Sequence, residues 1–497
     1  LAGGGAAAAA LAGVGGGYAL AGADDAPPVA QPPPGPPPRY RSRPDLRALP
    51  EVTVTHPARG AQPGYVFLTP ASGAGLWGPL IVDDTGSPVW FRKVSDPATV
   101  AIDLKVQRYR GQPVLTWWEG TIGGTGGQGV GQGEFVIVDA SYREVARVRA
   151  SGAEQADQHD FVITPNNTAL FLVYELVPVD LSALGGPANG VLHDGVIQEI
   201  DIATGRKVFE WRARDHITTA ESYSPLPQGD KINMPFDYLH PNSVGLDADG
   251  NLLMSARHTW ACYKIHRRTG AVLWRLGGKR SDFAIGERAA FSWQHDIRRR
   301  RDGTYGLFDN VAGIPALATT GSQSRGLVLR LDEAARTATF VREFLHPNKL
   351  LGPSQGGLQE LDDGGSFVGW GQQPHFSEHA PDGTLRFAGH LPLDNQSYRG
   401  YRFEWVGKPA DQPALTLRVE GGNVIVHVSW NGATGVSRWR VRAGNQPTTP
   451  LPVVAEAART GFETVLTVPG RPVYVVAEAL DGTGTVLGSS ATLPVQV

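Results

Sequence analysis

From about residue 51 onward, apolar residues occur in short runs separated by turns. Runs of Val, Ile, Leu, Phe and Trp alternate with Asp-Gly, Thr-Gly and Asn turns, and long patterns of helical period are missing. Short runs bounded by turn residues are typical of β-strands, whereas an amphipathic helix repeats its apolar positions at helical spacing over a longer stretch. The pattern therefore predicts an all-β protein.

Two units recur along these runs. The first starts at a histidine, passes through a turn and ends in an apolar strand. It occurs at residues 159–172, 240–254 and 295–308, and without the histidine at 356–370. In the second unit a turn glycine precedes an aromatic residue by four positions, as expected of a hairpin whose second strand buries the ring. It occurs at residues 83–90, 201–209 and 266–274. The spacing of the histidines suits four-stranded propeller blades with inserted loops.

Counting candidate inner strands gives the fold prediction. Residues 66–82 and 104–118 add two such strands to the four histidine-type units, so that six blades are expected. A propeller needs its ends joined, and residues 383–391 together with 401–406 are expected to complete the first blade. The strands after Lys408 alternate cleanly, as in a small sandwich of fibronectin type III character. We predict a six-bladed β-propeller at residues 51–408 and a fibronectin type III-like β-sandwich at 409–497.

The first fifty residues have a different composition. Residues 1–23 are uncharged, apolar and rich in small residues, as at the end of an export signal, and their glycine content favours the twin-arginine type. A retained membrane anchor is the alternative, because about 20 residues can just span a bilayer. Residues 24–50 are rich in proline and predict an extended, unpacked linker. Either reading places the bulk of the protein outside the cytoplasm, secreted or membrane-anchored, with any membrane tether confined to the N-terminal segment.

Composition excludes several classes of protein. Of 497 residues, 41% are hydrophobic, which is too many for a disordered chain. The net charge is −3, which gives no general reason to expect nucleic acid, and the run Arg298–Arg301 is interpreted as a solvated turn flank. Cys262 is the single cysteine, so neither an intrachain disulfide nor a cysteine-based zinc site can form. No cofactor is expected.

The candidate site comes from the repeated histidines. His159, His240 and His295 start equivalent units, and the inner strands of a propeller line a central channel, so these side chains are expected to converge there. The alternative is structural, with His-Asp pairs that tie one blade to the next by hydrogen bonds. Arg257, just downstream of His240, favours an anion-handling site, because arginine binds oxyanions through a planar fork and histidine acts as nucleophile or acid–base near neutral pH.

Four motifs together carry a family resemblance. HPNS (240–243), SARH (255–258), WRLGGK (274–279) and WQHD (293–296), with FDN at 308–310, resemble the arylsulfotransferase family of bacterial β-propellers, from about Gly64 to Val406. The sequence more closely resembles an actinobacterial and fungal branch of this family. The resemblance implies sulfuryl transfer from a phenolic sulfate ester to a phenolic acceptor, without a nucleotide donor, through a sulfohistidine intermediate. Its partners are then small molecules, an aryl sulfate and a phenol, and nucleic acid is not among them.

The resemblance also assigns roles to residues. By position, His295 is the nucleophile, Arg257 and His240 hold the sulfate oxygens, and His159 makes a further sulfate or phenolic-oxygen contact. The aspartates Asp160 and Asp296 are candidates for orienting the neighbouring rings. A neutral imidazole avoids repulsion with the sulfate, and charge on the departing phenolate calls for electrostatic stabilisation.

Two other functions compete with this interpretation, and two local motifs suggest other kinds of site. A quinoprotein-like oxidoreductase shares the Thr-Gly turns but calls for more blades and usually a vicinal cysteine pair. An extracytoplasmic binding or adhesion propeller without catalysis predicts that the histidines are dispensable. The G-x-G-x-x-G at 124–129 precedes a strand rather than a helix, so a loop is favoured over a dinucleotide site. The motif HFSEH at 375–379 is a weak metal candidate, because it is expected in a loop or strand.

Overall fold

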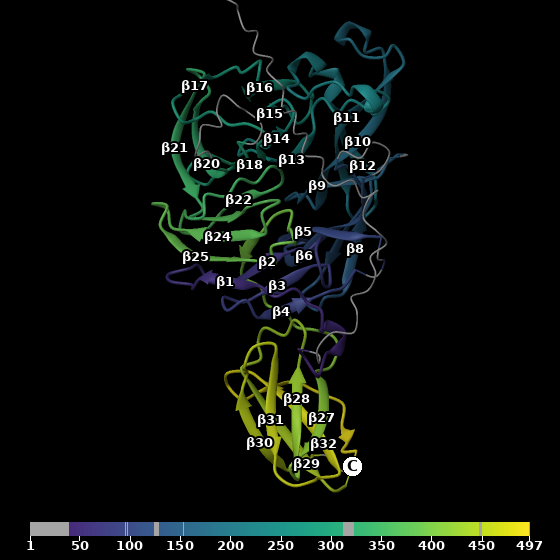
Figure 1. Ribbon diagram of the computed structural model, residues 1–497, viewed down its shortest axis with the longest axis vertical. Helices are drawn as coiled ribbons and strands as arrows, with labels where there is room; N and C mark the ends of the chain where they lie inside the picture. Colours follow the sequence, from purple (N-terminus) through teal and green to yellow (C-terminus); the bar gives the residue numbers. More distant parts are fainter. Residues whose placement is uncertain are drawn as a thin grey trace, which may run out of the picture.

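The computed structural model describes residues 39–94, 96, 98–123, 129–152, 154–311, 323–446 and 450–496. Within these ranges the regular elements are β-strands and short 3-10 turns, with no α-helix (Figure 1). The 3-10 turns are η2 (Pro44–Leu46), η3 (Ser182–Leu184), η4 (Ala213–Asp215), η5 (Thr219–Glu221) and η6 (Gly229–Lys231). The prediction of an all-β protein is confirmed. No helix in the described ranges is long and apolar enough to cross a membrane. The segment 1–23 and most of the glycine-rich motif at 124–129 lie outside the described residues.

The first sheet joins the two ends of the region between residues 51 and 408. β26 (Tyr401–Phe403) pairs antiparallel with β2 (Tyr65–Leu68), and β3 (Leu80–Val82) and β4 (Pro88–Phe91) complete the sheet in the order β26-β2-β3-β4. The strand expected within residues 401–406 therefore does pair with the start of the region. Residues 383–391 do not join this sheet. Their strand, β25 (Leu385–His390), belongs to another sheet, in which it pairs with β24 (His375–His379) and β1 (Thr53–His56).

A second sheet has eight strands that fall into two groups of four. They are β5 (Val100–Tyr109), β6 (Gln112–Ile122), β7 (Gly131–Val138), β8 (Glu144–Val148), β9 (Ala156–Ile163), β10 (Thr168–Val179), β11 (Gly190–Asp201) and β12 (Lys207–Arg212). Within the described residues, strand pairing between the two groups is limited to one residue pair, Gly133 of β7 and Ala156 of β9. Apart from that pair, β5–β8 and β9–β12 each form a four-stranded antiparallel unit.

Three further sheets follow along the chain. One contains β13 (Pro241–Leu246), β14 (Leu252–Ala256), β15 (Ala261–Ile265) and β16 (Val272–Gly277). The next contains β18 (His295–Arg299), β19 (Tyr305–Asp309), β20 (Arg325–Asp332), β21 (Thr337–Leu345) and the short β17 (Ala284–Ile285). The last contains β22 (Gly357–Glu360), β23 (Ser366–Gly369), β24 (His375–His379), β25 and, at its edge, β1 (Thr53–His56).

The turns and packing explain the repeated sequence units. Gly250, Gly303 and Gly364, the turn glycines of three histidine-type units, have φ of 80°, 83° and 82°, a region that a side chain disfavours. The strands after these turns bury apolar side chains between neighbouring sheets; Leu253 and Leu307, for example, pack in one cluster between the β13–β16 and β17–β21 sheets. The first strands of the successive units, β5, β9, β13, β18 and β22, contact one another in that order, and β26 contacts β5.

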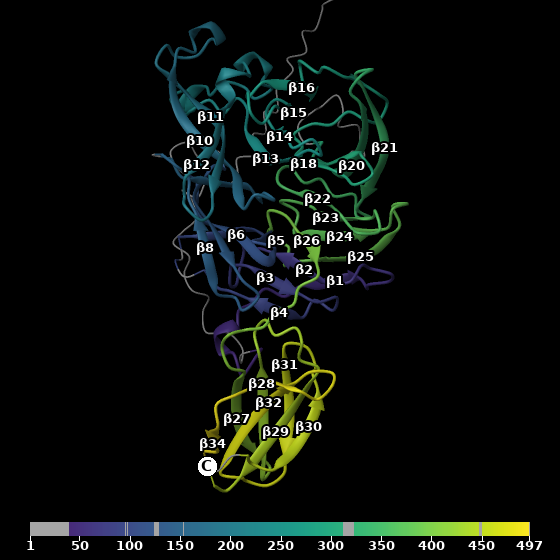
Figure 2. The same cartoon turned by 180° about the vertical axis from the view of Figure 1, so that it is seen from behind.

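Beyond β26 the chain forms two more sheets, below the others in Figure 1 and seen from behind in Figure 2. One contains β27 (Ala414–Glu420), β28 (Asn423–Ser429) and β31 (Glu463–Val468). The other contains β29 (Arg438–Gly444), β30 (Val453–Ala458), β32 (Tyr474–Leu480), β33 (Val486–Ser489) and β34 (Leu493–Pro494). Trp439 of one sheet and Val426 of the other lie in the same buried cluster. The fibronectin type III character of these two sheets and the domain boundaries stay predictions.

The end of the proline-rich segment is packed, contrary to the expectation of an unpacked linker. Tyr40 is 7% exposed, and its ring lies 4.8 Å from that of Phe462 between the two sets of sheets. Ser42 Oγ lies 2.8 Å from Ser429 Oγ, and the Ser42 main-chain N–H donates to Glu463 Oε2 at 2.6 Å. Apolar and hydrogen-bonding residues at the end of a proline-rich stretch are enough to fix it against a surface.

The basic run is also not the solvated turn flank that was expected. Arg300 is 3% exposed and donates to Ser366 Oγ at 3.1 Å and to the carbonyl oxygen of Gly364 at 2.9 Å. Arg298 forms ion pairs with buried aspartates, whereas the Arg301 side chain is 60% exposed. Most of the run therefore stabilises the fold.

Candidate active site

The four predicted site residues lie together. His159 is within β9, His240 directly precedes β13, and His295 is the first residue of β18. Arg257 lies in the turn between β14 and β15. The ring centroids of His159 and His240 are 4.8 Å apart, and the pKa of His295 is lowered in part by Arg257, His159 and His240. All three histidines are buried. The inner strands thus bring together residues that are far apart in the sequence.

Asn310 fixes the tautomer of His295. The amide nitrogen of Asn310 donates to the carbonyl oxygens of Gly352 (2.8 Å) and Gln355 (3.1 Å), so its oxygen is the atom that faces His295 Nδ1 at 2.8 Å. An amide oxygen can only accept, so Nδ1 carries the ring proton and Nε2 carries the lone pair. The main-chain N–H of Gln355 donates to Nε2 at 3.2 Å. Burial, and then Arg257, hold the pKa of His295 well below its ordinary value, so the ring is neutral.

The other two histidines have carboxylate partners. His240 Nδ1 lies 2.5 Å from Asp237 Oδ2, and His159 Nδ1 lies 2.5 Å from Asp157 Oδ1. Each Nδ1 therefore carries a proton. Burial holds the pKa of His240 well below its ordinary value, so Nε2 of that ring is left as an acceptor. When Nε2 takes a proton during a reaction, the carboxylate stabilises the resulting imidazolium, which Asn310 cannot do for His295. The site thus contains two kinds of imidazole.

The aspartates that follow two of the histidines in sequence do not orient those rings, so that expectation is wrong. Asp160 Oδ2 accepts from the main-chain N–H of Val244 at 3.0 Å, and Asp296 Oδ2 accepts from that of Leu358 at 3.2 Å. Each bond runs to the inner strand of the next unit. In each His-Asp pair, the aspartate therefore connects neighbouring units by a hydrogen bond, as the structural alternative predicts, while the histidine belongs to the site.

Arg257 supplies a buried positive charge. Its Nη2 donates to the carbonyl oxygen of Pro353 at 3.1 Å, and its guanidinium lies over the Trp293 ring at 4.5 Å from the centroid. Burial lowers the pKa of Arg257 to about 10, so it is still charged near neutral pH. Among the described residues its buried Nε has no hydrogen-bond partner. A desolvated guanidinium with an unused donor beside the site histidines suits an oxyanion.

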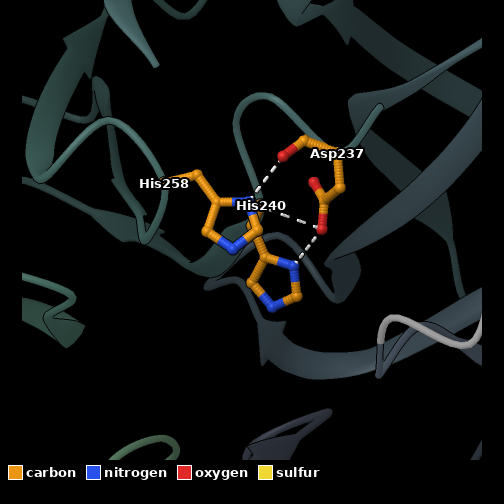
Figure 3. A group of neighbouring side chains, drawn as sticks. All are labelled: Asp237, His240 and His258. Atoms are coloured by element: carbon orange, nitrogen blue, oxygen red, sulfur yellow. Dashed lines mark hydrogen bonds and ion pairs between the residues drawn. The ribbon is translucent and has the colours of Figure 1, made fainter. Parts of the chain in front are cut away.

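His258 and Asp237 are members of the site that the sequence did not single out. Asp237, His240 and His258 form the one group in the described part of the chain whose ligand atoms, all within 4.8 Å of one another, could hold a metal ion (Figure 3). Three of the four ring nitrogens already have a partner, however. His258 Nδ1 donates to the Asp237 carbonyl oxygen at 2.6 Å, and His258 Nε2 accepts from Arg257 Nη1 at 3.1 Å. Because both Nδ1 atoms carry protons, the group fits a hydrogen-bond network rather than a metal.

Two tyrosines complete the surroundings of the histidines. The ring centroids of Tyr174 and Tyr398 lie 5.9 Å and 5.8 Å from that of His159. Their hydroxyls donate to main-chain oxygens, that of Tyr174 to Pro241 at 2.9 Å and that of Tyr398 to Asn242 at 3.4 Å. Burial raises both pKa values well above the ordinary one, so both phenols stay protonated. No spacing pattern in the sequence marks these residues, since each reaches the site only through the fold.

The histidines of HFSEH belong to another cluster, in β24. The ring of His375 lies 5.0 Å from that of His346 and 5.1 Å from that of His390. His379 Nε2 lies 2.9 Å from Ser377 Oγ. Burial lowers the pKa values of His346, His375 and His379 to about 4. The ligand atoms of this cluster do not meet the spacing of the group around Asp237.

Comparisons with known proteins bear on the larger region. A sequence model described as Arylsulfotransferase (ASST) matches residues 105–390. None of the curated proteins matches the chain. Similar solved structures include a protein of unknown function from Bacteroides caccae, with 12% identity over 69% of this chain and 100% of that chain and a TM-score of 0.40. Another is virginiamycin B lyase from Staphylococcus aureus, with 9% identity over 81% of this chain and 97% of that chain and a TM-score of 0.32.

Proposed function

The chain belongs to the arylsulfotransferase (ASST) family, and we propose that it moves a sulfuryl group from a phenolic sulfate ester to a phenolic acceptor through a sulfohistidine on His295. The reaction needs no nucleotide donor and no cofactor. Family membership supports small aryl molecules as substrates. The phenolic donor and acceptor, and the actinobacterial and fungal branch, are parts of the proposal. The mechanism rests on the side chains around His295.

One observation carries the assignment of roles: His295 faces the amide of Asn310, whereas His240 and His159 face carboxylates. A nucleophile must present a lone pair, and the neutral His295 ring does so at Nε2. A general base must accept a proton, and a carboxylate behind the ring stabilises the charge that then forms. His295 is therefore assigned as nucleophile, and His240 or His159 as base.

In the first half-reaction, His295 Nε2 attacks the sulfur of the donor. The N–S bond forms as the bond between sulfur and the phenolic oxygen breaks, and the phenolate departs with that electron pair. Arg257 holds the sulfuryl oxygens throughout, and the main-chain N–H of Gln355, released from Nε2, is close enough to donate to one of them. Because Asn310 cannot take the Nδ1 proton, the sulfated ring is positively charged and remains a good leaving group.

In the second half-reaction, the acceptor phenol attacks the same sulfur. Its hydroxyl proton passes to Nε2 of His240 or His159, the new O–S bond forms, and the N–S electron pair returns to His295. Once protonated, the base donates to a sulfate or phenolic oxygen, which accounts for the contacts that the family resemblance implies for both histidines. Loss of its proton to water restores the starting state.

We infer that the catalytic region is a six-bladed β-propeller. The support is the count of four-stranded units: β2–β4 with β26, β5–β8, β9–β12, β13–β16, β18–β21 and β22–β25. The pair Gly133 and Ala156 merges two of these units into the eight-stranded sheet. The order of contacts among the inner strands supports a ring whose centre holds the candidate site. An extracytoplasmic location, secreted or anchored, remains part of the proposal on the composition of residues 1–23.

The activity is tested by incubating the protein with p-nitrophenyl sulfate and phenol and following release of p-nitrophenolate. We expect turnover that depends on phenol. His295→Asn should abolish it, and Arg257→Lys should lower the rate ~10²–10³-fold, as removal of one oxyanion contact does elsewhere.

The matched control is His379→Asn. His379 is also a buried histidine, at 1% exposure, but it contacts none of the four site residues in the described structure. It should retain wild-type turnover. Equal rates for His295→Asn and His379→Asn would refute His295 as the nucleophile. No turnover in the wild-type protein would instead support a binding protein in which the site histidines are dispensable.

A further inference from the structure

Arg399 is a fully buried arginine that comes from outside the strands that carry the histidines. It lies two residues before β26, and its side chain has 0% exposure. Its guanidinium contacts residues of β9, β13 and β18, whereas that of Arg257 donates to His258. The mechanism above gives Arg399 no role.

The guanidinium of Arg399 contacts a residue close to each of the three histidines in sequence. Nη1 lies 3.2 Å from Oδ1 of Asp160, which follows His159. Nη2 donates to the carbonyl oxygen of Asn242 at 3.1 Å, two residues after His240. Nη2 also lies 3.6 Å from Oδ1 of Asp296, which follows His295. One rigid planar group thus connects three strands.

The charges around Arg399 balance within the buried network. Besides Asp160 and Asp296, Asp103 contacts Arg399 Nη1 at 3.4 Å. Two further cations serve these carboxylates: Lys105 lies 2.6 Å from Asp103, and Arg298 lies 2.9 Å from Asp296. Three carboxylates and three cations thus pair with one another; the carboxylates are at most 3% exposed, whereas the Arg298 side chain is 27% exposed. Such a network is costly to break on one side only, so its geometry is strongly held.

The packing around Arg399 leaves it little freedom. A Cβ added at Gly357 would lie 2.7 Å from Asp296 Oδ2 and 3.1 Å from Arg399 Cδ, so only glycine leaves room for this pair. The guanidinium also lies 5.1 Å from the centroid of the Tyr398 ring, and that ring in turn packs against His159. Arg399 is therefore fixed by the same side chains that surround the site.

We propose that Arg399 is a positioning residue that sets the spacing of His159, His240 and His295 by holding their three strands to one guanidinium. The proposal rests on the proposed function in assigning a catalytic purpose to that spacing. Arg298, on β18, adds to the same connection between strands. It pairs with Asp296 and donates to the carbonyl oxygen of Val244 at 2.7 Å. Lysine in place of Arg399 keeps the charge but not the planar fork, so it cannot reach all three strands with one group.

Arg402 provides a matched control for a purely structural role. It lies three residues further on, in β26, and its side chain is 1% exposed. It likewise pairs with two carboxylates, Glu378 at 3.0 Å and Asp84 at 2.7 Å. Neither carboxylate lies on a strand that carries a site histidine. Arg402→Lys should therefore perturb the fold about as much as Arg399→Lys, without moving the histidines.

The test combines kinetics with ring-nitrogen NMR of protein labelled at histidine, with signals assigned by single His→Gln variants. We expect Arg399→Lys to lower kcat ~10²-fold with a smaller change in KM, as a misplacement of about 1 Å does. The ring signals of His159, His240 and His295 should shift, while those of His346 and His379 stay. Arg402→Lys should leave kcat within about twofold and the three site signals unmoved.

Two results would overturn the proposal: unchanged ring signals in Arg399→Lys, or shifted signals with an unchanged kcat. If the wild-type protein shows no sulfotransfer at all, the proposed function fails, and the NMR comparison still decides whether Arg399 positions the histidines. Should Arg399→Lys not fold, the charge-balanced pair Asp103→Asn with Arg399→Gln removes one cation and one carboxylate together and is read in the same way.

Discussion

The carboxylates behind two of the histidines provide a way to separate the two half-reactions. Asp237→Asn keeps an oxygen that accepts from His240 Nδ1, so the tautomer is retained, but it removes the negative charge. Asp157→Asn makes the same change behind His159. The prediction is that the variant behind the true base slows transfer to the acceptor, while sulfation of His295 continues.

The size of the effect follows from the contact distance. Each carboxylate oxygen lies 2.5 Å from the ring nitrogen, and a hydrogen bond to a charged group contributes about 1.5–3 kcal/mol. If all of that contribution is expressed in the transition state of proton transfer, the acceptor step slows by a factor of ~10 to ~10². The step in which His295 attacks the donor involves no proton transfer to these rings and should change little.

Rapid mixing with p-nitrophenyl sulfate measures both steps in one trace. The burst of p-nitrophenolate, about one per protein molecule, reports sulfation of His295, and the steady state with phenol reports transfer to the acceptor. We expect a preserved burst and a slower steady state in at least one of the two variants. A lost burst in Asp237→Asn and in Asp157→Asn, or a steady state that neither change slows, would refute the assignment of His240 or His159 as base.

Three further predictions concern pH, anion binding and the packed N-terminal segment. Burial holds the pKa values of His240 and His295 well below the ordinary one. On acidification through pH ~6.5 the unfolded chain therefore takes up protons while the folded rings stay neutral, so the free energy of unfolding should be highest above that pH and decrease below it. Urea titrations at several pH values measure this change. Arg257→Lys should raise the KM for the aryl sulfate as well as lower kcat, because the planar fork contacts the sulfate before and during transfer, and steady-state kinetics with varied donor would detect an unchanged KM as a contradiction. Tyr40→Ala should destabilise the protein by about 3–5 kcal/mol, the usual result of removing a buried aromatic ring, with sulfotransfer at low temperature unchanged; an unaltered melting curve would refute the importance of that contact.

The sequence predicted elements that depend on local pattern and repetition. Short apolar runs and turn glycines such as Gly250 and Gly303 indicated the strands, and the recurring histidines indicated that His159, His240 and His295 share a site. Recurrence works here because equivalent positions on inner strands meet in space, whatever their separation along the chain. Arg257 entered the prediction through the SARH motif.

The sequence could not predict which partner each polar side chain would find. Asp160 and Asp296 adjoin the histidines along the chain, yet their hydrogen bonds run to the next inner strands rather than to the rings. The ring partners Asp237 and Asn310 lie outside the strands, at positions that only the folded chain defines. Burial of Arg300 and of Tyr40 was missed for the same reason, since charge runs and proline-rich stretches carry no signal for the surfaces they meet.

In the proposed mechanism, His295 carries the sulfuryl group between donor and acceptor. The sharpest test is intact-mass spectrometry of the protein mixed with aryl sulfate alone, followed by peptide mapping under conditions that preserve the N–S bond. We expect an added mass of one SO₃ per molecule, located on His295, lost on addition of phenol and absent in His295→Asn. An adduct on another residue, or an adduct that persists in His295→Asn, would contradict it.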